Sequence, residues 1–129
     1  MKQKLGAIAV LASLTLIPLT GGCTFQQRAI MGQIGYAGTQ TGRVEVIATR
    51  PGEQGITSFY AILMNNLGPY NIRVRTGTYT VSAYTDTNYN DKQDPNEPFG
   101  FYDGDGDGKA DEIVVKGEVT DIDIILHDP

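Results

Sequence analysis

This chain of 129 residues is poor in the side chains that most enzymes and zinc sites use. It has one cysteine, Cys23, and one histidine, His127, so the sequence provides neither an internal disulfide nor a zinc site built from His and Cys. It has no G-x-S-x-G motif and no second histidine for a catalytic triad. No segment has the strand-to-helix context of a phosphate-binding loop. We therefore predict that the protein is not an enzyme.

Basic residues are also few, at 10 against 15 acidic residues. Segment 86–112 holds nine of the acidic residues and only two lysines, whereas acids and bases balance in the rest of the chain after residue 22. Without a basic surface to meet phosphate groups, nucleic acid is excluded as a partner. Acidic residues this dense repel one another unless a cation neutralises them, so segment 86–112 is predicted to bind a metal ion.

The first half of this segment fits the twelve-residue calcium loop, whose ligands stand at positions 1, 3, 5, 7, 9 and 12. The candidate ligands are Asp86, Asn88, Asn90, Lys92 through its carbonyl group, Asp94 and Glu97. Position 6 normally holds glycine because the backbone turns sharply there, and here it holds Asp91. Aspartate tolerates the left-handed conformation better than most residues, so we expect a strained turn.

The second half follows the spacing D-x-D-x-D-G-x-x-D, with Gly108 at the turn position. Its candidate ligands are Asp103, Asp105, Asp107 and Asp111. Position 12 is Val114, which cannot coordinate a metal, so the loop is expected to close with Asp111, with Glu112 or with a ligand from the first loop. The two halves predict one or two Ca²⁺ ions, bound weakly with a dissociation constant of about 10⁻⁴ to 10⁻³ M.

Two alternatives to calcium binding remain open for segment 86–112. Runs of like charge are often solvated, disordered linkers. Asp and Asn side chains also close loops without a metal, by forming Asx turns with the backbone.

The start of the chain has the pattern of a secretory signal peptide. Residues 1–4 carry two lysines, residues 5–19 are almost wholly apolar, and residues 20–23 are small or polar. The apolar run is too short to predict a membrane span. We predict a signal peptide over residues 1–22.

Cys23 directly follows that segment, and Gly22-Cys23 resembles the lipobox of bacterial lipoproteins. This resemblance implies that Cys23 is acylated and anchors the mature chain to a membrane. Thr24 next to it implies the outer membrane of the bacterial envelope, with the protein facing the periplasm or the surface. Plain secretion after cleavage near Gly22 is the alternative.

Residues 23–42 are rich in Gly, Gln and Thr and keep no regular period, so they predict a flexible tether, with at most a short helix. From residue 43 the pattern becomes that of β-strands. Segment 43–49 alternates, and segment 57–64 is a continuous apolar run that predicts either a strand covered on both faces or a short buried helix.

Later segments alternate more clearly. Residues 70–74 and 79–83 predict a hairpin with one buried and one exposed face. Residues 113–116 and 119–126 predict a final pair in which the side chains of Ile122, Ile124 and Leu126 point inward. Six or seven short strands, Gly-rich turns and no amphipathic helix predict an all-β protein, a small antiparallel β-sandwich over residues 43–129.

The run GTYTVSAYTDTN at 77–88 continues with Asn90, Asp94, Glu97-Pro98 and Gly100. It resembles a segment of bacterial prealbumin-like domains, also called transthyretin-like or carboxypeptidase-regulatory-like, in which a calcium loop follows a core strand. The DGDGDGKAD run resembles the loops of dockerin and thrombospondin type 3 repeats. The first resemblance covers about residues 68–102 and implies a seven-stranded Greek-key sandwich that is accessory and non-catalytic.

Four aromatic residues alternate with the acidic ones, namely Tyr89, Phe99, Phe101 and Tyr102. If exposed, they favour a second hypothesis, an adhesion or accessory module that binds a glycan or an envelope protein. The competing interpretation is that Phe99 and Phe101 share one face and cap the open end of the sandwich. A third hypothesis is a structural envelope lipoprotein without a metal.

Overall fold

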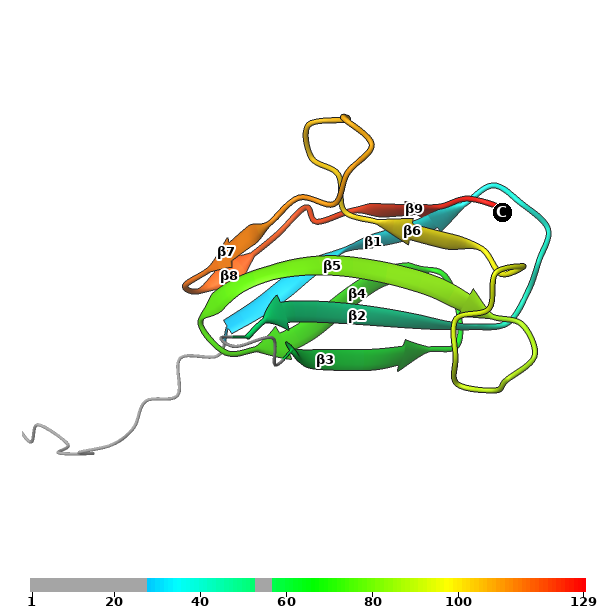
Figure 1. Ribbon diagram of the computed structural model, residues 1–129, viewed down its shortest axis with the longest axis horizontal. Coiled ribbons are helices and arrows are strands. Elements are labelled where there is room, and N and C mark those ends of the chain that lie inside the picture. The colour runs from blue at the N-terminus through cyan, green and yellow to red at the C-terminus, as the bar shows by residue number, and fades with distance from the viewer. Residues whose placement is uncertain (1–27, 53–56) are drawn as a thin grey trace, which may run out of the picture.

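The computed structural model describes residues 28–52 and 57–129 (Figure 1). The predicted signal peptide and Cys23 lie outside the described residues. The described residues form nine strands and no helix, so the prediction of an all-β protein is confirmed. No helix long and apolar enough to cross a membrane occurs in this part of the chain.

The strands form two sheets packed face to face as a sandwich (Figure 1). One sheet has the order β4 (Gly68–Val74), β1 (Arg28–Tyr36), β8 (Glu118–Val119), and β9 (Ile124–Leu126) also pairs with β1. The other has the order β3 (Thr57–Met64), β2 (Arg43–Pro51), β5 (Gly77–Asp86), β6 (Phe99–Phe101), and β7 (Ile113–Val115) also pairs with β5.

The core lies between the sheets and follows the alternation of the sequence. Both sheets contribute every second side chain, because successive side chains of a strand point to opposite faces. In β2 and β5 these include Val46, Val81 and Ala83, each 0% exposed. Ile122, Ile124 and Leu126 are also buried, as predicted.

The prediction of a flexible tether over residues 23–42 is wrong for Arg28–Tyr36. This segment is strand β1, which pairs with β4 on one side and with β8 and β9 on the other. Gly32 and Gly35 obscured the strand pattern, since glycine is depleted in strands. Gly32 is needed here because another backbone passes directly over it, at Ile122.

Two predicted pairings are also wrong, although the predicted buried faces are right. Strands β4 and β5 do not form a hairpin; β4 pairs with β1, and β5 pairs with β2 in the opposite sheet. Likewise β7 pairs with β5, whereas β8 and β9 pair with β1 in parallel. The sandwich is therefore mainly but not wholly antiparallel.

Segment 57–64 is a strand, as one of the two predictions stated, but it is not covered on both faces. Strand β3 lies at the margin of its sheet (Figure 1). Tyr60, Ile62 and Met64 pack partly against the core. On the opposite face Phe59 is 67% exposed and Leu63 is 57% exposed.

The acidic segment forms two separate loops. The β5–β6 loop, residues 87–98, extends from the end of β5, and the β6–β7 loop, residues 102–112, projects from the side of the sandwich where β6 ends (Figure 1). The two loops do not lie side by side, so neither supplies the other with side chains.

Candidate metal centre

The β6–β7 loop brings together the four aspartates predicted for the second half of the segment. Asp103, Asp105, Asp107 and Asp111 each place a carboxylate oxygen within 4.8 Å of the others. Asp111 thus closes the group, whereas Glu112 lies outside it. We call these four residues the Asp103 cluster.

The backbone of this loop turns its carboxylates inward. Gly106 and Gly108 have φ angles of 76° and 83°, which confirms the predicted need for glycine at the turn. Their N–H groups donate to the two carboxylate oxygens of Asp103, over 2.8 and 2.7 Å. The carboxylate of Asp111 accepts from the N–H of Gly104 over 2.6 Å, which draws the far side of the loop toward the same centre.

The neck of the loop is fixed to the sheet. The N–H of Asp111 donates to the carbonyl oxygen of Tyr102 over 2.9 Å, and the N–H of Tyr102 donates to that of Val81 in β5 over 2.9 Å. These bonds keep the Asp103 cluster at a defined place on a rigid support, although Asp105 and Asp107 themselves are exposed.

Charge repulsion shows in the pKa values of the cluster. The pKa of Asp103 is lowered despite its partial burial. The cause is hydrogen bonding from the N–H groups of Gly108, Gly106 and Asp107 and from the side chain of Asp105. The N–H of Asp107 acts to lower the pKa of Asp105, but the hydrogen bond to Asp103 and the charges of Asp107 and Asp111 outweigh it and raise this pKa. No Lys or Arg of the described residues forms an ion pair with the cluster. Asp105 therefore retains a proton more readily than an ordinary aspartate.

The β5–β6 loop has the same backbone arrangement. Asp86 at position 1 accepts the N–H groups of positions 5 and 6, Asn90 and Asp91, over 3.1 and 2.9 Å, as Asp103 accepts those of its own positions 5 and 6. Positions 4 and 6 have positive φ in both loops; here they are Tyr89 at 60° and Asp91 at 62°. The predicted left-handed turn at Asp91 is confirmed.

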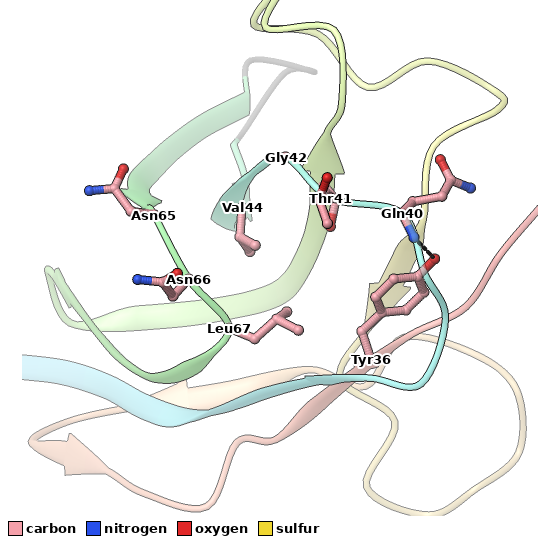
Figure 2. Close-up of a pocket in the computed structure, with 9 residues that line it drawn as sticks. Tyr36, Gln40, Thr41, Gly42, Val44, Asn65, Asn66 and Leu67 are labelled. Carbon is pink, nitrogen blue, oxygen red and sulfur yellow. Dashed lines mark hydrogen bonds between the residues drawn. The ribbon is translucent and has the colours of Figure 1, made fainter.

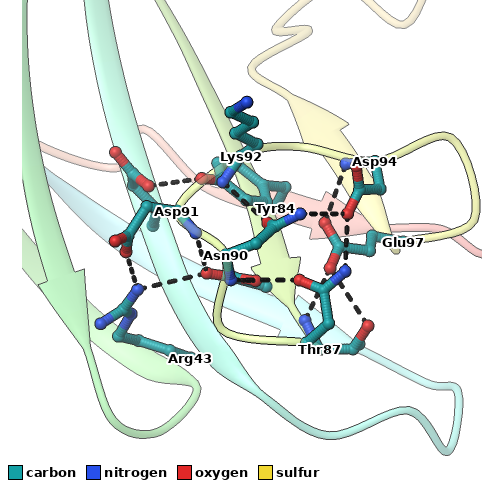
Figure 3. A network of polar contacts seen from close by, with 11 residues as sticks. Arg43, Tyr84, Thr87, Asn90, Asp91, Lys92, Asp94 and Glu97 are labelled. Carbon is teal, nitrogen blue, oxygen red and sulfur yellow. Dashed lines mark hydrogen bonds and ion pairs between the residues drawn. The ribbon is translucent and has the colours of Figure 1, made fainter.

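The first loop differs in how its charges are neutralised (Figure 3). Arg43, at the start of β2, lies opposite Asp86 in the sheet and donates to its carboxylate over 3.2 Å. Arg43 also forms an ion pair with Asp91, and its guanidinium lies 5.8 Å from the centre of the Tyr89 ring. Sequence reasoning did not find this arginine, because it lies 43 residues before Asp86 and no local pattern links the two.

The remaining acids of the first loop also have internal partners (Figure 3). The side-chain amides of Asn88 and Asn90 both donate to one oxygen of Asp94 over 2.8 Å. Glu97 is 2% exposed; it accepts the N–H of Thr87 over 2.8 Å and the N–H of Asp94 over 2.9 Å. The acids of residues 86–97 do not gather as the Asp103 cluster does. Hydrogen bonds thus close this loop in the manner of the metal-free alternative.

The four aromatic residues do not form one row. Phe99 and Phe101 share a face of β6, with ring centres 6.1 Å apart, and pair across the sheet with Tyr84 and Ser82. They lie on the outer face of the sheet rather than over its open end. Tyr89 is 65% exposed on the first loop, and Tyr102 packs partly against the core.

Two of the cavities in the described residues differ in their relation to the loops, because only the first of them borders an acidic loop. One, of about 390 Å³, is lined by Phe99, Gly100, Phe101, Ile125 and His127, and by Asp103 and Gly108 of the second loop. The other, of about 190 Å³, lies between the β1–β2 loop and the β3–β4 turn, with Tyr36, Val44 and Leu67 in its lining (Figure 2). Thr85 also lines it, and its buried hydroxyl has no hydrogen-bond partner.

The resemblance to prealbumin-like domains rests on residues 68–102 of the sequence and stays a prediction. Comparison with protein-family models, with curated proteins and with solved structures finds no match for this chain.

Proposed function

We propose that this chain is a non-catalytic calcium-binding protein, in which a Ca²⁺ ion held by the Asp103 cluster orders the β6–β7 loop of the sandwich. One observation carries the proposal: four carboxylate oxygens lie within 4.8 Å of one another. Like charges this close repel one another, and no cationic side chain of the described residues pairs with them. A divalent cation at their centre turns this repulsion into attraction.

The ligand chemistry favours calcium over other common ions. Ca²⁺ takes six to eight oxygen ligands in a flexible shell, and the exposure of Asp105 and Asp107 leaves room for water beside the carboxylates. Mg²⁺ requires a tighter octahedral shell, and Zn²⁺ prefers His and Cys ligands, which this loop lacks. The ion would stabilise the loop rather than take part in a reaction.

In this proposal the first loop, residues 87–98, needs no ion of its own. Its internal hydrogen bonds and Arg43 fix its shape, so one ion in the second loop is enough to order the whole acidic segment.

The proposed location of the protein rests on residues 1–23 alone. We propose an outer-membrane lipoprotein anchored through acylated Cys23, because a lipobox-like sequence follows a signal peptide.

Calcium is expected to stabilise the folded protein measurably. Every described strand begins after residue 27, so a chain of residues 24–129 retains the whole sandwich. For this chain, CaCl₂ at ten to a hundred times the dissociation constant should add about 1.4 to 2.7 kcal/mol to the free energy of unfolding. Thermal unfolding in EDTA and in about 10 mM CaCl₂, at fixed ionic strength, should then show a rise in Tm of about 5 °C or more.

Matched variants locate the ion. Asp107→Asn removes one charge from the cluster and should abolish most of the rise in Tm. Glu112→Gln removes the same charge beside the cluster and should leave the rise intact. An equal rise with MgCl₂, or equal behaviour of the two variants, would contradict a specific calcium site.

A second candidate function is the binding of a glycan or a protein at the 390 Å³ cavity. Its lining contains the rings of Phe99 and Phe101 together with Asp103. Such a cavity suits a glycan or a protein side chain that packs on Phe99 and Phe101 beside the ion. In that case a bound ligand should shift the NMR signals of both phenylalanines, and Phe101→Ala should weaken binding at least about tenfold while Tyr89→Ala should not. Shifts centred on Tyr89 would exclude the cavity as the binding site.

A further inference from the structure

Strand β3 is an open edge of the sandwich (Figure 1). Within residues 28–52 and 57–129 it pairs with β2 alone, over eight residues from Thr57 opposite Pro51 to Met64 opposite Val44. Its other side therefore presents a row of backbone N–H and C=O groups that a further strand can pair with.

Devices that normally protect an edge are missing from this strand. The sequence TSFYAILM has no charged residue and no proline, and its outer face exposes Phe59 and Leu63. Two other margins do carry such protection. Strand β4 carries Pro69 and Arg73, and the three-residue β6 is covered by His127, which exchanges two backbone hydrogen bonds of 3.0 Å with Phe99.

We propose that β3 pairs with the β3 strand of a second copy of this chain, antiparallel and centred on Ala61. This proposal is independent of calcium binding. A two-fold symmetric contact requires a surface that is complementary to itself, and β3 meets this condition. Phe59 and Leu63 lie two residues to either side of Ala61, so in this register Phe59 faces Leu63 of the partner subunit, and the small Ala61 faces its own counterpart.

The remaining pairs of this register agree with it. Tyr60 faces Ile62 of the partner subunit on the inner side of the sheet, so aromatic and branched side chains meet again. Because β3 is uncharged, no like charges oppose one another across the contact. A single strand pair buries less area than a standard stable interface, so the dimer is expected to be weak and concentration-dependent.

The association itself is tested by sedimentation velocity on residues 24–129 over a range of concentrations. The unmodified chain should shift from monomer to dimer as concentration rises. Leu63→Lys should weaken the dimer at least about tenfold, because two lysines then oppose the exposed phenylalanines on the edge. Leu67→Lys makes the same chemical change in the adjacent turn, at a residue 43% exposed, and should leave the dimer unchanged.

Cross-linking tests the register. Residues 24–129 contain no cysteine, so a single introduced cysteine reports on its own copy in the partner. Ala61→Cys should form a disulfide-linked dimer under mild oxidation, because directly opposed residues have Cβ atoms about 4.5–5.5 Å apart. Leu63→Cys should not, since its counterpart lies four residues along the strand. A monomer at all concentrations, equal cross-linking at both positions, or capture of β3 by an extended peptide from another protein would overturn the proposal.

Discussion

Replacing Gly32 by alanine is expected to reduce the free energy of unfolding by at least about 3 kcal/mol. A Cβ atom on Gly32 would lie 1.9 Å from the carbonyl oxygen of Ile122 and 2.4 Å from its carbonyl carbon. Both atoms belong to the backbone, so no side-chain rotation relieves the clash. Ile122 is also held in place: its N–H donates to the carbonyl of Met31 over 3.0 Å, and its carbonyl accepts from the hydroxyl of Tyr70 over 2.7 Å.

Gly35 provides the matched control, because it lies in the same strand and nothing lies within 4 Å of the position of its Cβ. Gly35→Ala should change the free energy of unfolding by no more than about 0.5 kcal/mol. Denaturant unfolding of both variants measures the difference. Similar free energies for the two would show that β1 does not cross the Ile122 backbone as closely as described.

Replacing Asp86 by asparagine is the second change with a large expected effect, at least about 2 kcal/mol of unfolding free energy. Asp86 is 1% exposed, and its two oxygens accept the N–H groups of Asn90 and Asp91 and the guanidinium of Arg43. An amide at this position places N–H groups against these donors and leaves Arg43 without one of its anions. Asp121→Asn removes the same charge from an exposed residue and should have little effect.

The effect of Asp86→Asn should depend on pH with a definite sign. Burial acts to raise the pKa of Asp86, but the N–H groups of Asp91 and Asn90 and the charge of Arg43 outweigh it, so the pKa lies below its usual 3.8. A lowered pKa means that the stabilisation is complete above about pH 4 and is lost as the pH falls through the lower, folded-state value. The gap in Tm between the original protein and Asp86→Asn should therefore be full at pH 7 and should narrow as the pH falls below the usual aspartate pKa of 3.8. A gap that widens on acidification would contradict the ion pair.

The fold shows which information a strand pattern carries. Alternation in 70–74 and 79–83 correctly predicted the buried faces, because burial depends on the period of the side chains along one strand. It did not predict the partners of these strands, because strands in a sandwich can cross between sheets without a change in the pattern. Strand β1 was missed for a different reason. Its Gly32 weakens the strand pattern, and the need for glycine there comes from the close approach of the Ile122 backbone, which is distant in sequence.

In the candidate site, too, local spacing was predictable from the sequence and long-range pairing was not. The Asp103 cluster was predicted with its four residues, since spacing within a short loop determines which side chains converge. Gly108 and Asp91 have the positive φ expected of position 6 in each loop. Arg43 could not be predicted, because only the pairing of β2 with β5 places it opposite Asp86. Because of that pairing, an arginine of the protein itself neutralises charges of the first loop, whereas the Asp103 cluster has no such partner among the described residues.

The position of β1 between β4 and the final strands has a consequence for how the protein folds. Ile34 pairs with Ile124, and Tyr36 pairs with Leu126, so the first described strand depends on the last one. Contacts between such distant segments make the contact order high, and folding correspondingly slow, because a long chain must close before these contacts form. A growing chain cannot complete this sheet before its C-terminal strand has been synthesised. This sheet therefore closes only once residues 124–126 have been made, and a chain that lacks them leaves the C-terminal half of β1 without a partner on that side.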